Sequence, residues 1–192
     1  MTTLSRIVLV NAIFIMTLYA CAAQEMNKKV IDANGREKLL GKIDKNGLQQ
    51  DAFITWFDVN YREYQMDTTT MAPLKKELDK FEIRAFMGTW CGDSRREVPR
   101  FYKILEELGY PAEKMKMVAV DYIKPNYKKS PGGEEKGLKI IKVPTFIFFK
   151  NGKEVNRIVE SPIVSLEKDM VTIVSGAHYI PKYANLLKLP QD

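Results

Sequence analysis

The sequence predicts an α/β fold in which a central mixed β-sheet is flanked by helices. Residues 81–87 and 115–121 are apolar runs typical of buried strands, and residues 95–108 between them carry apolar side chains at helical spacing. An Asn-Gly turn joins two strands within residues 145–159, and residues 165–174 predict a last amphipathic helix. Strands joined through a helix run parallel and strands joined by a tight turn run antiparallel, so a mixed sheet is expected.

Residues 25–73 are expected to form an N-terminal extension to this unit. Within it, residues 38–43 lie between two turn signals and predict a short edge strand. Pro73 suits a helix start, and residues 74–80 predict a short helix. Residues 48–64 predict an amphipathic helix whose aromatic face packs into the core, because its aromatic side chains recur at spacings of three and four. These are Phe53, Trp56, Phe57, Tyr61 and Tyr64.

Three connecting segments are expected outside these elements. Residues 88–94 predict a tight loop between the first central strand and its helix. Residues 124–137 are hydrophilic and rich in proline and glycine, which predicts a solvated loop, with a short helix expected over residues 134–140. Residues 176–192 are expected to form a C-terminal tail.

Composition and charge narrow the class of protein. The 45% hydrophobic and 28% charged fractions are ordinary for a globular chain, and they exclude a disordered or multi-span membrane protein. Arg6 is the one charged side chain among residues 1–24, so residues 25–192 carry 29 basic and 24 acidic groups, a net charge of +5. This excess is too diffuse to predict nucleic acid as a partner.

The first 24 residues have the pattern of a secretory signal peptide. Arg6 precedes an apolar run over residues 7–20, which is too short for a comfortable membrane span, and small residues follow it. The chain is therefore expected to be exported to the cell envelope or periplasm.

The end of this segment, Leu-Tyr-Ala-Cys at residues 18–21, resembles a bacterial lipobox. In such signals the cysteine, here Cys21, becomes the lipidated first residue of the mature chain and attaches it to the membrane. Tyr19 departs from the pattern, since a small residue is usual there. The alternative is ordinary cleavage after residue 22 or 23, which discards Cys21. In either case the domain keeps at most one free thiol, Cys91, and an intramolecular disulfide is excluded.

Cys91 is the candidate reactive residue. It follows a buried strand at the first turn of a helix, where unpaired N–H groups and the helix dipole favour thiolate over thiol. Arg95 and Arg96 would add to this positive field, and Asp93 would oppose it. Ser94 stands where its hydroxyl could donate to the Cys91 sulfur, or it simply caps the helix, as Asp93 also could. The alternative for Cys91 is an inert buried thiol.

The pentapeptide Trp90-Cys91-Gly92-Asp93-Ser94 is similar to the Trp-Cys-Gly-Pro-Cys loop of the thioredoxin family. Pro99, eight residues after Cys91, falls where that family has its helix-kinking proline. Val143-Pro144-Thr145 looks like the family's cis-proline loop, which faces the active cysteine, and the Asn-Gly turn at 151–152 matches its hairpin. The resemblance covers residues 74–175 and implies a thioredoxin-like fold for that domain, as an exported bacterial member.

Three departures from the family pattern bear on function. Ser94 replaces the resolving cysteine, Asp93 replaces the loop proline, and Ala85 stands where many thioredoxins carry a buried acid. The resemblance therefore implies a monothiol variant, in which Cys91 forms a mixed disulfide that an external thiol must release.

The resulting hypothesis is a monothiol thiol-disulfide oxidoreductase or isomerase of the cell envelope. Cys91 and Ser94 are the expected catalytic residues, and disulfide-containing proteins or low-molecular-weight thiols are the expected partners. The expected substrate-binding residues are Trp90, Gly92, Asp93, Val143, Pro144 and Thr145. The alternative is a non-catalytic thioredoxin-fold module that binds or chaperones through the Pro144 groove.

No metal or other cofactor is expected. The single histidine, His178, lies in the tail, and with at most one free cysteine the usual ligands of a zinc site are not available.

Overall fold

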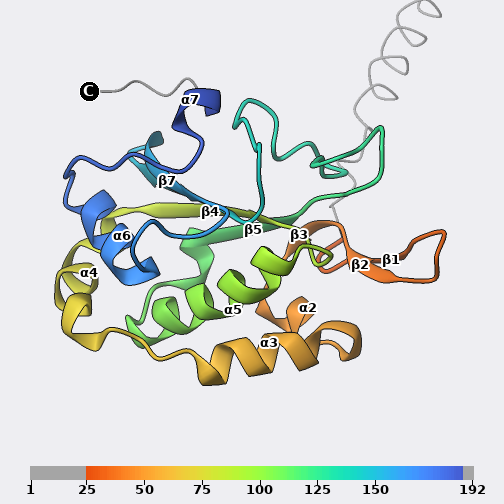
Figure 1. The fold of residues 1–192 in the computed structure, drawn as a ribbon, viewed down its shortest axis with the longest axis horizontal. Helices are drawn as coiled ribbons and strands as arrows, with labels where there is room; N and C mark the ends of the chain where they lie inside the picture. The colour runs from red at the N-terminus through yellow and green to blue at the C-terminus, as the bar shows by residue number, and fades with distance from the viewer. Residues whose placement is uncertain (1–24, 188–192) are drawn as a thin grey trace, which may run out of the picture.

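A five-stranded mixed sheet forms the centre of the computed structural model, which describes residues 25–187 (Figure 1). The strand order is β3-β5-β4-β6-β7, and a separate two-stranded hairpin, β1-β2, projects at one end of the molecule. The strands are β1 (Lys29–Ile31), β2 (Glu37–Leu39), β3 (Gly41–Ile43), β4 (Glu82–Met87), β5 (Met115–Ala119), β6 (Thr145–Lys150) and β7 (Lys153–Val159).

The pairing of the strands confirms the predicted mixed sheet. The central strand β4 runs parallel to β5 and antiparallel to β6, while β3 and β7 form antiparallel edges. Asn151 and Gly152 make the turn between β6 and β7 with φ of 52° and 75°. A tight hairpin turn of this kind requires positive φ at both central residues, and Asn-Gly adopts it at low cost.

The helices lie mainly on one side of the sheet. They are α2 (Lys45–Leu48), α3 (Asp51–Glu63), α4 (Met71–Glu77), α5 (Gly92–Glu107), α6 (Leu166–Val174) and α7 (Ala184–Leu187). Side chains of α5 and α6 pack against the sheet in the main core, and α3 lies on the outer side of α5 (Figure 1). The opposite face carries a smaller apolar cluster that includes Phe86 and Ile147, and Leu138 and Ile140 pack against it from the long connection between β5 and β6.

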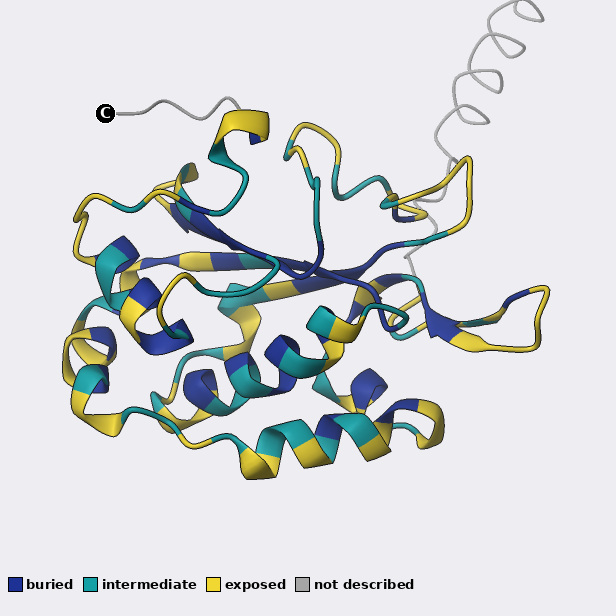
Figure 2. Cartoon of the chain, viewed as in Figure 1, coloured by how far each residue is buried: buried dark blue, intermediate teal, exposed yellow. Residues whose placement is uncertain are grey.

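The predicted aromatic helix is confirmed as α3. Phe53 and Phe57 are buried, and the other aromatic side chains of this face, Trp56, Tyr61 and Tyr64, are partly buried against the main core. Figure 2 shows the buried surface concentrated on the sheet and on the sides of the helices that face it, whereas the outer side of α3 is largely exposed.

Several predicted segments differ from the observed elements, including the helix expected over residues 74–80, which is observed as α4 over Met71–Glu77. The helix after β4 begins at Gly92 rather than at residue 95, because Cys91 is already the N-cap and its carbonyl accepts a hydrogen bond from the Arg95 N–H at 3.0 Å. Residues 134–140 form turns rather than a short helix. Gly137 and Lys139 have positive φ there, and the buried Arg157 donates to the Leu138 carbonyl at 2.7 Å, so tertiary contacts hold this segment in an irregular path.

The predicted edge strand over residues 38–43 is divided between two sheets. Its first half belongs to β2, which pairs with β1, and its second half is β3, the edge of the main sheet. The chain changes direction at Leu40 and Gly41, where Gly41 has a φ of 85° that glycine adopts without steric cost.

Neither a membrane-spanning helix nor a metal cluster is found in the part of the chain that the structure describes. Between residues 25 and 187 no helix is long and apolar enough to span a bilayer. The same range contains no group of three His, Cys, Asp or Glu side chains arranged to hold a metal ion. Cys21 and the predicted signal segment lie outside the described residues.

Candidate active site around Cys91

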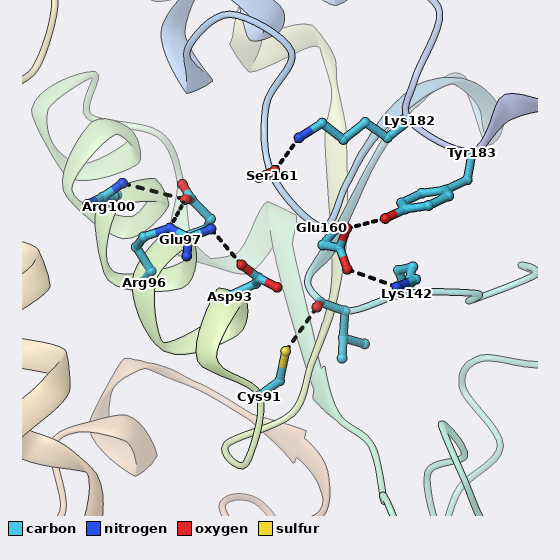
Figure 3. Close-up of polar contacts among 11 residues, drawn as sticks. Cys91, Asp93, Arg96, Glu97, Arg100, Lys142, Glu160, Ser161, Lys182 and Tyr183 are labelled. Atoms are coloured by element: carbon cyan, nitrogen blue, oxygen red, sulfur yellow. Dashed lines mark hydrogen bonds and ion pairs between the residues drawn. The ribbon is translucent and has the colours of Figure 1, made fainter.

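Cys91 lies at the junction between β4 and α5. It is the N-cap of α5, with extended backbone angles of −89° and 125°, and its side chain is half-buried. A turn holds it there, because the Cys91 N–H donates to the Gly88 carbonyl at 2.9 Å. Its Sγ lies 3.2 Å from the carbonyl oxygen of Val143 (Figure 3), so the thiol meets the loop that precedes β6.

Ser94 is fully buried beneath this turn. Its hydroxyl accepts a hydrogen bond from the Gly88 N–H at 3.2 Å, and among the described residues it makes no hydrogen bond with Cys91. The side chain therefore fastens the turn that carries Cys91. Gly88 leaves room for the Trp90 ring, because a Cβ there would lie 2.4 Å from that ring.

Trp90 forms one wall of the site. Its indole N–H donates to the Val120 carbonyl at 2.9 Å, and its ring lies 5.6 Å from that of Tyr122 and 6.4 Å from that of the half-exposed Tyr127. Tyr122 in turn donates from its hydroxyl to Asp32 of the N-terminal hairpin. The hairpin thus supports the Trp90 side of the site.

A buried ion pair fastens the hairpin next to this wall. Lys38 lies 2.5 Å from Asp121, and both side chains are largely shielded from solvent. Burial alone would raise the pKa of Asp121, but the hydrogen bonds from Lys38 and from two backbone N–H groups outweigh it and lower that pKa. Asp121 therefore stays ionised and keeps the hairpin in place at neutral pH.

The loop of Val143, Pro144 and Thr145 also meets Cys91, and the Val143–Pro144 peptide bond is cis. All three residues are buried. The Thr145 hydroxyl donates to the Lys142 carbonyl at 2.7 Å, and the Pro144 carbonyl accepts from the Glu160 N–H at 2.7 Å. The structure therefore brings the two predicted halves of the site, Cys91 and the Pro144 loop, into contact.

The charged side chains on α5 are arranged differently from the prediction. Arg96 does not face Cys91 as a free cation, because it pairs with Asp93 at 2.6 Å and with the buried Glu97 at 2.6 Å (Figure 3). Arg95 donates to the Thr89 carbonyl at 2.6 Å. Asp93 and Glu97 thus offset the charge of Arg96, and Gly92 is exposed.

A second polar cluster lies beside the Pro144 loop, and sequence reasoning missed it. Glu160 accepts hydrogen bonds from Lys142 at 3.1 Å and from the Tyr183 hydroxyl, and Lys182 donates to Ser161 (Figure 3). Burial would raise the pKa of Glu160, but the hydrogen bonds from Tyr183 and Lys142 lower it. The hydrogen bond to Glu160 in turn raises the pKa of Tyr183. No local pattern marks this cluster, since Lys142, Glu160 and Tyr183 are far apart in the sequence.

The family profile described as Thioredoxin matches residues 66–171 of this chain, more than half of its length. The chain belongs to the thioredoxin family. The matched residues include Cys91 and Pro144, and they end inside α6. Thioredoxin-family domains carry out thiol-disulfide exchange, generally on disulfide-containing proteins.

Individual proteins of this family are also similar to the chain in sequence. The chain is 33% identical over 87 residues to a thioredoxin-like protein of Acanthamoeba polyphaga mimivirus, covering 45% of this chain and 57% of that protein. It is 29% identical over 93 residues to thioredoxin H2 of Arabidopsis thaliana, covering 48% of this chain and 62% of that protein. A thioredoxin of Malassezia sympodialis is 34% identical over 82 residues, covering 42% of this chain and 70% of that protein. The chain thus spans less than two thirds of the first two relatives.

Proposed function

We propose that this thioredoxin-family chain is a monothiol thiol-disulfide oxidoreductase or isomerase that acts through Cys91. The observation that carries the proposal is the position of the thiol at the N-cap of α5, 3.2 Å from the carbonyl of Val143 in the cis-proline loop. The first turn of a helix has backbone N–H groups without intrahelical partners, and these can donate to a sulfur at this position during exchange. Ser94 stands in the resolving position, so the second thiol must come from outside the chain.

The reaction that fits this site is an exchange of one S–S bond for another. The Cys91 thiolate attacks a substrate disulfide, a Cys91–substrate S–S bond forms, the original S–S bond breaks, and the leaving thiolate takes up a proton from water. An external thiolate, from a protein or a low-molecular-weight thiol, then attacks the substrate sulfur, forms a new disulfide with it and releases Cys91. Each step conserves electrons, so the cycle needs no separate oxidant or reductant.

The walls of the site supply the substrate contacts. Trp90 offers an apolar surface, and the exposed Gly92 leaves room above the helix start, since a Cβ at that position would have nothing within 4 Å of it. The backbone of Val143 would pair with an extended substrate segment in the manner of an added strand, while Pro144 and Thr145 hold this loop in place. Asp93, which is partly exposed in the first turn of α5, follows Gly92 directly.

We expect the full-length chain to accumulate covalent complexes through Cys91. Cells producing it would be quenched with an alkylating agent and analysed on non-reducing gels. Wild type and Cys21→Ser should form complexes that disappear on reduction, because Cys91 is intact in both, and Cys91→Ala should form none. The absence of complexes in wild type, or their survival in Cys91→Ala, contradicts the proposal. Partners that stay bound without a covalent link in Cys91→Ala would support the alternative of a non-catalytic binding module.

We also propose export of the chain, with lipidation at Cys21. The support is the pattern of residues 1–24, in which Arg6 precedes a short apolar run and a lipobox-like Leu-Tyr-Ala-Cys. The expected result is a mature N-terminus at Cys21 with the mass of an added lipid, measured on protein extracted from the membrane fraction. Cys21→Ala should move the chain out of that fraction. An unmodified N-terminus between residues 22 and 24 rules out lipidation, and an intact Met1 rules out cleavage.

A further inference from the structure

The turn that carries Cys91 is fastened to the N-terminal hairpin β1-β2. Strands β4 and β5 run parallel, so Thr89, which follows β4, and Asp121, which follows β5, lie at the same end of the sheet. The Leu39 N–H of β2 donates to the Thr89 hydroxyl oxygen at 3.3 Å, and both residues are buried. The neighbouring Lys38 ammonium lies 2.5 Å from the Asp121 carboxylate. The hairpin is therefore attached to the active-site turn and to the end of the adjacent strand.

Tyr122 is the residue on which these attachments converge. Its backbone N–H donates at 2.6 Å to Oδ1 of Asp121, the same oxygen that accepts from Lys38. The Lys38 ammonium also lies 4.9 Å from the centre of the Tyr122 ring. The Tyr122 hydroxyl donates to the carboxylate of Asp32 in the hairpin. Tyr122 is thus held at its backbone, at its ring and at its hydroxyl.

The ring of Tyr122 lies against the indole of Trp90. The two ring centres are 5.6 Å apart, within the range in which aromatic pairs stabilise one another. The indole N–H donates to the Val120 carbonyl at 2.9 Å, and Trp90 packs with Cys91 against the smaller apolar cluster of the sheet. The orientation of the indole beside Cys91 therefore depends on the position of Tyr122.

The carboxylate of Asp32 is fixed by its own turn before it meets Tyr122. Its Oδ1 accepts from the Asn34 N–H at 2.7 Å and from the Arg36 N–H at 3.0 Å, which leaves Oδ2 for the Tyr122 hydroxyl. Asp32 is also buried. The hairpin lies outside residues 66–171, the part of the chain that the Thioredoxin profile matches. This support of the site is therefore an addition to the family domain.

We propose that Tyr122 is a positioning residue for Trp90 and that Asp32 acts on the site through the Tyr122 hydroxyl. An indole held in one orientation gives a substrate a fixed apolar surface beside Cys91, and little freedom of the ring is lost on binding. Releasing the indole weakens substrate binding, while the thiol keeps its contact with the Val143 carbonyl. This inference rests on the proposed function of Cys91.

The first measurement follows the indole itself and needs no exchange reaction. With Cys21→Ser and Trp56→Phe as the parent, Trp90 is the only tryptophan and Cys91 the only thiol of the chain. Fluorescence quenching by acrylamide then reports how firmly the Trp90 indole is held. Urea denaturation of each protein separates this local effect from a change in overall stability.

Three variants and a control are compared with this parent. Tyr122→Phe removes only the hydroxyl, Asp32→Ala removes its acceptor, and the third variant combines the two. Each single variant should increase the quenching constant of Trp90, and the combination should add nothing, because both changes cut the same link. Lys29→Ala removes an exposed ion pair of the same hairpin and should leave quenching unchanged. Unchanged quenching in Tyr122→Phe, or additive effects in the combination, overturns the inference.

The second measurement is disulfide exchange with a short synthetic peptide that contains one disulfide, with β-mercaptoethanol as the external thiol. In Tyr122→Phe the KM for the peptide should rise about fivefold, the factor that loss of one hydrogen bond gives, with kcat unchanged. A merely structural role would lower stability and leave both quenching and KM of the folded protein as they are. An unchanged KM, in a parent that reacts, overturns the inference. If quenching changes as expected and even the parent does not react with the peptide, Tyr122 positions Trp90 and the proposed exchange reaction fails.

Discussion

Ser94→Cys is expected to give the chain an internal disulfide with Cys91 and a two-thiol cycle that wild type lacks. The two positions are three residues apart across the start of α5, and residues at that spacing are neighbours, with about 5–6 Å between Cβ atoms in a regular helix. Cys91 is the N-cap and has extended backbone angles, so its side chain does not follow the direction of the side chains inside the helix. The similar loop of the thioredoxin family carries cysteines at these two positions.

The measurement is mass spectrometry after mild oxidation, in a Cys21→Ser background. Oxidised Ser94→Cys should lose two hydrogen atoms and resist alkylation, and reduction of a protein disulfide driven by a dithiol should become faster. Ser94→Ala is the control. It removes the acceptor of the buried Gly88 N–H, so a loss of stability of about 1–3 kcal/mol is expected with no new disulfide. Two alkylatable thiols in oxidised Ser94→Cys would contradict the assignment of Ser94 to the resolving position.

Phe101→Ala is expected to lower the free energy of unfolding by about 3–5 kcal/mol, the usual cost of emptying a large aromatic site in a core. Phe101 is completely buried on the inner side of α5, stacked on Phe146 at 4.1 Å between ring centres and edge-on to Phe148 at 6.3 Å. These rings join the helix that carries Cys91 to the strand that follows Pro144. Urea denaturation monitored by circular dichroism measures the loss.

Two other substitutions on α5 serve as controls for this loss of stability. Phe101→Leu keeps most of the apolar volume and should cost less than Phe101→Ala. Glu107→Ala changes an exposed position of the same helix and should alter stability by about 0.5 kcal/mol or less. If Phe101→Ala costs no more than Glu107→Ala, Phe101 does not connect α5 to the sheet in the way the structure shows.

The sequence predicted the elements whose signals are local. The alternation and apolar runs placed β4 and β5, the aromatic spacing placed α3, and the Asn-Gly dipeptide placed the hairpin turn at residues 151–152. The resemblance to the thioredoxin family also predicted that Cys91 faces the cis-proline loop, whose Val143 lies 52 residues further along the chain. The helix expected over residues 134–140 was wrong because Arg157, from another strand, holds that segment.

The sequence by itself determined the order of β4, α5, β5, β6, β7 and α6 and the place of Cys91 at a strand–helix junction. Side-chain periodicity and turn chemistry act over a few residues, so these signals are local. Only the tertiary structure decided what surrounds the thiol. Arg96 is neutralised by Asp93 and Glu97, and Glu160 joins Lys142 to Tyr183 of the tail. Contacts between segments so far apart depend on how the packed core orients them, and no local pattern records that orientation.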